Sequence, residues 1–168
     1  GAPLVGECLA NIECRGVEVS TAGDPPAIGD PLPAFQLTRI DLDDLASSSL
    51  AGRRIVLNVF PSVDTGVCAM SVRRFNELAA DVPDVAVVCV SHDLPFALGR
   101  FCGAEGIERV IATSAFRSPF GVDYGLTMVD GPLRGLLART VIVADADHVV
   151  RHVELVDPTT GKEPDYDA

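Results

Sequence analysis

The chain of 168 residues is long enough for one domain that buries its own core without disulfides or metal ions. Its 24 acidic and 13 basic side chains give a formal net charge of −11, which argues against nucleic acid and anionic membranes as partners. No apolar run approaches the roughly 20 residues that cross a bilayer, and residues 1–7 lack the basic and apolar regions of a signal peptide. We therefore expect a single domain, residues 1–168, in the cytoplasm.

The cysteines indicate reactive thiols rather than a covalent scaffold. Their number is odd and they include no CxxC pair, which fits neither a disulfide framework nor a zinc site: Cys8, Cys14, Cys68, Cys89 and Cys102. His148 and His152 fall in predicted turn and strand positions, where we expect surface residues and not metal ligands. We expect neither a metal nor a bound cofactor.

Residues 1–28 are predicted to form an N-terminal extension built around a small β-hairpin. Within it, residues 12–19 alternate in the way that is typical of two short paired strands. Cys8 and Cys14 lie in this extension, and a structural or incidental role is the simplest for both. A proline-rich loop then leads to a predicted strand at residues 33–38.

A strand, a loop and a helix follow one another near the centre of the chain. Residues 54–60 form a run typical of a strand, and residues 68–80 carry apolar side chains at helical spacing. If Thr65 is the N-cap of this helix, Cys68 occupies the N3 position in its first turn. The free N–H groups and the dipole of a helix start favour negative charge, and so a nucleophilic thiolate.

Cys68 by itself is open to two interpretations. Free cysteine is among the most buried residue types, so Cys68 can be read as a small core residue that begins a helix. The preceding loop favours the second interpretation, a reactive thiol. Pro61 fixes the backbone and removes a donor, while residues 64–66 are formers of turns and caps. A shaped loop of this kind presents a cysteine as a functional site requires.

The rest of the chain alternates strands and helices. Residues 84–91 are a valine-rich run, typical of a strand buried on both faces, in which Cys89 is most simply a core residue. Pro95 marks the start of the next helix, where Cys102, taken alone, is also a core residue. The remaining predicted elements are a short strand at 109–112, a short helix within 114–125, a strand within 135–144, a turn at 145–148 and a strand at 149–156. This order predicts an α/β protein with a mixed central sheet.

Several stretches resemble the thiol peroxidases of the Tpx subfamily of peroxiredoxins. The resemblance spans most of the chain from about Gly29 and rests on four motifs in the family's order: Pro61–Cys68, Ser91–Cys102, Gly135–Arg139 and Glu163–Tyr166. It implies a thioredoxin-like fold with flanking helices and a thiol-dependent peroxidase that reduces hydrogen peroxide and alkyl hydroperoxides. His92 departs from the usual residue. The given sequence ends just after the last motif, where the family continues into a final helix, so either that helix is cut short here or this chain departs from the pattern.

The resemblance also implies a role for each site residue. Cys68 would be the peroxidatic nucleophile and form a sulfenic acid, which Cys102 would convert to an intrachain disulfide. Thr65 and Arg139 would hold the sulfur and the peroxide oxygens, and Pro61 would shield the sulfur from bulk water. From sequence position alone, Arg139 could equally be a surface arginine at the start of a strand.

The same resemblance implies thioredoxin as the reductant, through thiol–disulfide exchange, and a homodimer. Because bonded cysteines need Cα atoms within about 4.4–6.8 Å, two cysteines on helices require local unwinding before they can join. A thioredoxin-type oxidoreductase is discarded, since Ser71 stands where a CxxC pair would have its second cysteine. A redox sensor with little turnover is the alternative from another class, and steady-state peroxide consumption separates the two.

Overall fold

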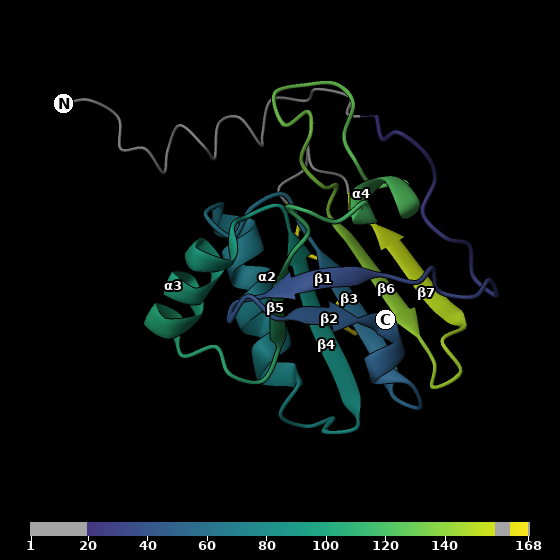
Figure 1. The fold of residues 1–168 in the computed structure, drawn as a ribbon, viewed down its shortest axis with the longest axis horizontal. Helices are drawn as coiled ribbons and strands as arrows, with labels where there is room; N and C mark the ends of the chain where they lie inside the picture. Colours follow the sequence, from purple (N-terminus) through teal and green to yellow (C-terminus); the bar gives the residue numbers. More distant parts are fainter. Residues whose placement is uncertain (1–19, 157–161, 168) are drawn as a thin grey trace.

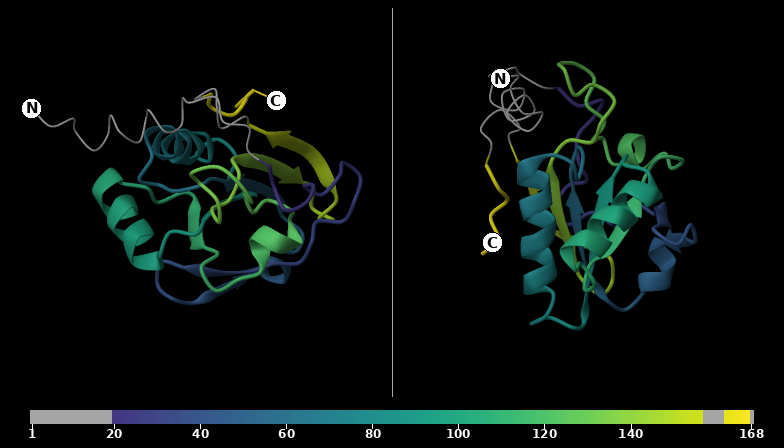
Figure 2. Two further views of the ribbon diagram at one scale, coloured as in Figure 1. Left: turned by 90° about the horizontal axis from the view of Figure 1, so that it is seen from above. Right: turned by 90° about the vertical axis from the view of Figure 1, so that its left-hand side faces the viewer.

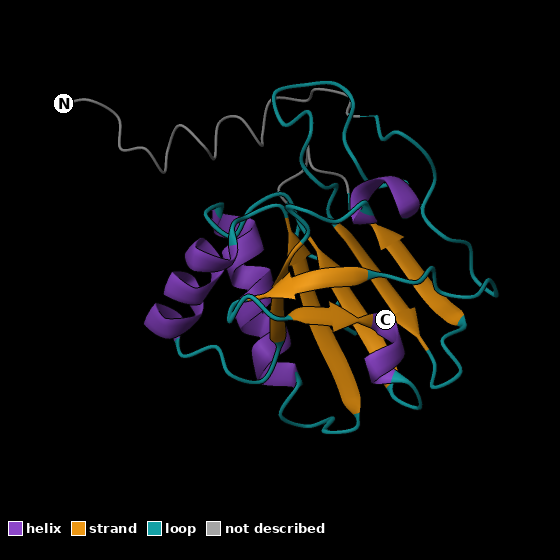
Figure 3. Ribbon diagram, viewed as in Figure 1, coloured by secondary structure: helices purple, strands orange, loops and turns teal. Residues whose placement is uncertain are grey.

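The structure is a computed structural model that describes residues 20–156 and 162–167. In this part of the chain, seven strands form one sheet in the order β2-β1-β5-β4-β3-β6-β7, flanked by helices (Figures 1 and 3). In chain order the elements are β1 (Gln36–Arg39), β2 (Asp44–Ala46), the 3-10 helix η1 (Ser47–Leu50), β3 (Arg54–Val59), α2 (Gly66–Leu78), β4 (Val85–Ser91), α3 (Pro95–Glu105), β5 (Ile111–Ser114), α4 (Phe120–Asp123), β6 (Thr140–Ala144) and β7 (Val150–Leu155).

The centre of the sheet is parallel and its edges are antiparallel. β4 pairs in parallel with both β3 and β5, whereas β6 runs antiparallel to β3 and β7 antiparallel to β6. On the other side, β1 pairs antiparallel with β5 and β2. The connections from β3 to β4 and from β4 to β5 each contain one helix. Since such crossovers are right-handed, α2 and α3 cover the same face of the sheet.

Two apolar clusters fill the space on the two faces. The cluster under α2 and α3 contains Cys68, Cys89 and Cys102, so three of the five cysteines lie in one layer. The cluster on the opposite face includes Phe120 of α4, whose ring stacks on Tyr124 at 4.1 Å between centroids. The right-hand view of Figure 2 shows α2 and η1 on opposite sides of the sheet.

The predicted mixed α/β sheet is confirmed, with some boundaries moved. β5 lies two residues later than expected, and β6 begins only at Thr140. The segment before Thr140 turns instead toward residues 126–128, with backbone hydrogen bonds from Gly135 N to Met128 O and from Ala138 N to Leu126 O. β2 and η1 were not predicted, because three or four residues are too few to display a hydrophobic period.

Some predictions fall at the margins of the described chain. The hairpin at residues 12–19, with Cys8 and Cys14, lies outside the described residues. Residues 162–167 are irregular and end in a turn. Among the described helices, none has both the length and the apolar character needed to cross a membrane. In the same residues, no group of three or more His, Cys, Asp or Glu side chains is placed to hold a metal ion.

Candidate active site

Three segments converge at one edge of the sheet because of its mixed topology. β3 and β4 are parallel, so the loop of residues 60–65 and the turn of residues 91–94 leave the sheet side by side. β6 is antiparallel to β3, and Thr140 pairs with Val59. Arg139 therefore enters the sheet where the loop of residues 60–65 leaves it. The topology assembles, at one place, residues from three of the four motifs.

Helix α2 presents Cys68 from its first turn. Thr65 is the N-cap, with an extended backbone, so Cys68 occupies N3 as predicted. Its side chain is 0% exposed and its thiol is free. The first turn contains no acidic side chain that would compete for the free N–H groups. The helix start thus favours a negative charge on this sulfur.

The guanidinium of Arg139 lies directly against that sulfur. Its Nη2 donates to Cys68 Sγ at 3.3 Å, and its Nη1 donates to the carbonyl oxygen of Lys162 at 3.2 Å. Arg139 is only 2% exposed, so it is not the surface arginine that sequence position alone allowed. A buried cation is costly unless an opposite charge or hydrogen bonds offset it, and a Cys68 thiolate would supply that charge.

Thr65 and Pro61, in the loop that precedes Cys68, are both buried. The hydroxyl of Thr65 donates to the carbonyl oxygen of Ser62 at 3.1 Å and makes no side-chain cap to α2. This bond fixes the direction of the hydroxyl proton and leaves the oxygen lone pairs as acceptors. The conformation of the loop of residues 60–65 therefore sets where the Thr65 hydroxyl points. Thr65 and Pro61 remain predicted substrate contacts.

The two other described cysteines lie in the same apolar layer but are less suited to be nucleophiles. Cys102, in the last turns of α3, is 6% exposed, and burial raises the pKa of its thiol. Burial also raises the pKa of Cys89, to about 12, so Cys89 stays a thiol at neutral pH. Asn58 donates to Cys89 Sγ at 3.6 Å and accepts from Ser71 Oγ at 3.0 Å. Cys89 is the core residue that its valine-rich strand predicts.

Ser62 and Asp93 had no predicted role, and the structure brings them together. Ser62 Oγ donates to Asp93 Oδ1 at 2.7 Å, across 31 positions of the chain. Both residues belong to motifs that were recognised for their cysteines. The available signal was their position, since each polar side chain lies within three residues of the end of one of two neighbouring parallel strands.

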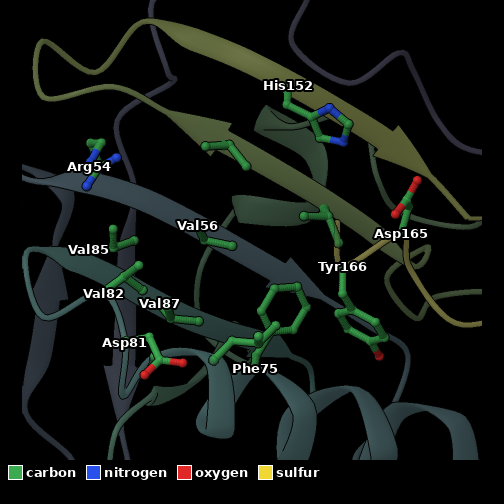
Figure 4. A pocket seen from close by; sticks show the side chains of 14 residues that line it. Arg54, Val56, Phe75, Asp81, Val82, Val85, Val87, His152, Asp165 and Tyr166 are labelled. Carbon is green, nitrogen blue, oxygen red and sulfur yellow. The ribbon is translucent and has the colours of Figure 1, made fainter. Parts of the chain in front are cut away.

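An apolar groove of about 360 Å³ lies between α2 and the sheet, and its lining does not include Cys68, Thr65 or Arg139 (Figure 4). Valine side chains form much of it, with the rings of Phe75 and Tyr166, which meet edge to face at 5.4 Å. Burial and a hydrogen bond to Glu163 raise the pKa of Tyr166. None of the described cysteines lines the groove, so it is not the site of the reactive thiol.

Comparison with known proteins agrees with this geometry. Residues 27–168 match the family model described as Redoxin. The thiol peroxidase of Corynebacterium glutamicum is 53% identical over 160 residues, which is 95% of this chain and 96% of that protein. The thiol peroxidase of Mycobacterium tuberculosis has the same identity and coverage.

Solved structures give the same picture for the fold. A peroxiredoxin-like protein from Aquifex aeolicus superposes with a TM-score of 0.83 at 36% identity, over 89% of this chain and 86% of that one. A thiol peroxidase from Chromobacterium violaceum superposes with a TM-score of 0.78 at 27% identity, over 84% of each chain. In both cases the similarity covers more than four fifths of this chain.

Proposed function

The chain belongs to the redoxin family and is a thiol-dependent peroxidase with a thioredoxin-like fold, and on that basis we propose that Cys68 is its peroxidatic cysteine. The observation that carries the proposal is the 3.3 Å contact between Arg139 Nη2 and Cys68 Sγ. A buried guanidinium stabilises a thiolate and offers further donors to oxygen atoms that gain charge during the reaction. Among the described cysteines, Cys68 is the one whose sulfur accepts a hydrogen bond from an arginine.

The first chemical step oxidises Cys68. Its thiolate attacks one oxygen of the peroxide, forms an S–O bond and breaks the O–O bond. The bonding electron pair leaves with the other oxygen, which takes up a proton and departs as water or as an alcohol. Cys68 becomes a sulfenic acid. Arg139 and Thr65 orient the peroxide and stabilise the departing oxygen, and Pro61 shields the sulfur.

The second step joins Cys68 to Cys102. The Cys102 thiol loses its proton and attacks the sulfenic sulfur, an S–S bond forms, and the sulfenic oxygen leaves as water. Cys102 lies in the same apolar layer as Cys68, which supports it as the resolving partner. Both side chains are buried on helices, so we include local unwinding of one or both helices in the proposal.

The cycle closes through an external dithiol, for which we propose thioredoxin in the cytoplasm. No metal and no bound cofactor takes part in any of these steps. We also propose a homodimer. The apolar side chains of Leu94 and Phe96 are exposed at the start of α3, beside the segment that carries Cys102, and would suit a subunit contact.

Steady-state peroxide consumption coupled to thioredoxin, thioredoxin reductase and NADPH tests this proposal. The wild-type chain is expected to turn over hydrogen peroxide and an alkyl hydroperoxide, and Cys68→Ser to lose turnover. Cys102→Ser is expected to react once with peroxide but not to cycle with thioredoxin. Turnover by Cys68→Ser at the wild-type rate would overturn the assignment of the nucleophile, and a single stoichiometric reaction of the wild type would indicate a sensor.

A further inference from the structure

The carboxylate of Asp93 joins the turn after β4 to the loop that leads to Cys68. Its Oδ1 accepts from Ser62 Oγ at 2.7 Å, and its Oδ2 accepts from Val63 N at 2.7 Å. Oδ2 also accepts from Ser91 Oγ at 2.8 Å, within its own turn. We call Asp93 with these three donors the Asp93 anchor. All three bonds are short and have a charged acceptor, which makes them stronger than neutral hydrogen bonds.

The Asp93 anchor is connected by further hydrogen bonds to the N-cap of α2. The carbonyl oxygen of Ser62 accepts from both the N–H and the hydroxyl of Thr65, each at 3.1 Å. Ser62 Oγ also accepts from Asp64 N at 3.2 Å. Asp93 therefore holds Ser62, and Ser62 holds the backbone and hydroxyl of Thr65, three residues before Cys68. Neither Asp93 nor Ser62 touches the sulfur in these contacts.

We propose that Asp93 is a positioning residue for the oxidation of Cys68, because it keeps the loop of residues 60–65 in the conformation that places Thr65 and Cys68 for peroxide. The inference rests on the proposed function, since it concerns the same thiol. Asp93 stands two residues before α3, the helix that carries Cys102. The anchor thus also ties the segment of one cysteine to the segment of the other, and it must open when α2 unwinds toward Cys102.

These two effects have opposite consequences for the two chemical steps. Without the anchor, the loop samples conformations in which Cys68 is not aligned with a peroxide, and the oxidation step slows. Formation of the disulfide requires the loop to leave the conformation that the anchor holds. Loss of the anchor therefore does not slow disulfide formation, and it speeds this step if opening of the loop is rate-limiting. A residue that merely stabilised the fold would impair both steps together.

A second contact between the same segments provides a matched control. Arg100 of α3 and Asp64 of the loop form an ion pair with 3.6 Å between Nη2 and Oδ1, and both side chains are largely exposed. Exposed pairs of this kind contribute little. Asp64→Asn makes the same chemical change as Asp93→Asn, in the loop that the Asp93 anchor holds, without removing a bond of the anchor.

The test follows each step separately in the fully reduced full-length chain, by rapid quench with hydrogen peroxide and mass spectrometry of the cysteines. Asp93→Asn is expected to slow formation of the Cys68 sulfenic acid by roughly 10- to 100-fold, the size of effect that small misplacement of reacting groups produces. The subsequent formation of the Cys68–Cys102 disulfide is expected at the wild-type rate or faster. Asp64→Asn should stay within about twofold of wild type in both steps.

Ser62→Ala removes one donor of the anchor and keeps the proposal testable if Asp93→Asn folds poorly. It should slow oxidation less than Asp93→Asn, and the double variant should be no slower than Asp93→Asn, because both act through one connection. Oxidation of both variants at the wild-type rate, or equal slowing of the two steps, would overturn the inference. Failure of wild-type Cys68 to react with peroxide would instead overturn the proposed function.

Discussion

Cys68 and Arg139 are both buried, and the charge of each offsets the cost of burying the charge of the other. A guanidinium in the interior needs anionic or polar partners, and a thiolate in the interior needs a cation and donors. Their contact of 3.3 Å meets both needs at the start of a helix whose dipole acts in the same direction. The charge of Arg139 and the geometry of its donors contribute separately, and substitution can distinguish them.

Arg139→Met removes both the charge and the donors while keeping a long apolar side chain. We expect the second-order rate of Cys68 oxidation by peroxide to fall by about 100- to 1000-fold, the range seen when a donor to a developing negative charge is lost. Arg139→Lys keeps the charge without the planar fork, so its rate of Cys68 oxidation should lie between those of Arg139→Met and wild type. Stopped-flow or rapid-quench kinetics measures this, and a wild-type rate in Arg139→Met would contradict it.

For Cys89 we predict an effect on the stability of the fold and not on catalysis. Burial raises the pKa of its thiol from the ordinary 9.0 to about 12, so the unfolded state ionises first as the pH rises. The stabilisation that Cys89 contributes is therefore complete below about pH 9 and is lost as the pH rises from about 9 to 12. At about 1.4 kcal/mol per pH unit, the loss is no more than about 4 kcal/mol.

Urea unfolding of wild type and Cys89→Ala at pH 8 and at pH 10.5 measures this effect. At pH 8 the variant should be less stable, by on the order of 1 kcal/mol for the lost core packing. At pH 10.5 the difference should shrink or reverse, because alanine cannot ionise. Peroxide turnover of Cys89→Ala should remain near wild type. Parallel losses of stability in both proteins would contradict this account of Cys89.

At the scale of elements, several contacts connect α2 and its preceding loop with α3 and the segments that flank it. Beyond the Asp93 anchor, Arg73 of α2 pairs with Glu105 of α3 at 2.8 Å. Asn76 Oδ1 accepts from the N–H groups of Glu108 and Arg109, just after α3. These contacts hold the bodies of the helices together, so the rearrangement for a Cys68–Cys102 disulfide should be confined to the turns that carry the cysteines.

We therefore expect hydrogen exchange to become faster on oxidation in the first turn of α2 and around Cys102 in α3. Exchange in the middle of α2 and in β3 and β4 should change little, because these segments keep their hydrogen bonds. The control is Cys102→Ser oxidised with one equivalent of peroxide, in which α3 should keep the protection of the reduced protein. Equal or slower exchange at both cysteine segments of the oxidised wild type would rule out local unwinding.

At the scale of the whole molecule, the features set by local sequence could be predicted well. Thr65 as N-cap and Cys68 at N3 followed from turn chemistry and helical period, and the buried β4 followed from its valine-rich run. Motif resemblance supplied the fold and the activity. The late start of β6 was not predicted, because residues 135–138 bond a neighbouring loop instead of the central sheet.

Features that depend on strand pairing could not be predicted from local pattern. Arg139 is buried beside Cys68 only because β6 pairs antiparallel with β3, and the residues around Arg139 do not reveal that register. Ser62 and Asp93 meet only because β3 and β4 are parallel neighbours. Both contacts join residues at least 31 positions apart, so hydrophobic period and turn chemistry carry no signal for them.

The most direct test of the two-cysteine cycle is to treat fully reduced protein with one equivalent of an alkyl hydroperoxide and map every cysteine by mass spectrometry. We predict one new link, between Cys68 and Cys102, with Cys89 still a thiol, and a trappable sulfenic acid at Cys68 in Cys102→Ser. Oxidation of Cys68 with Cys102 left free would contradict the resolving role. Survival of all five thiols would contradict the account of Cys68 itself.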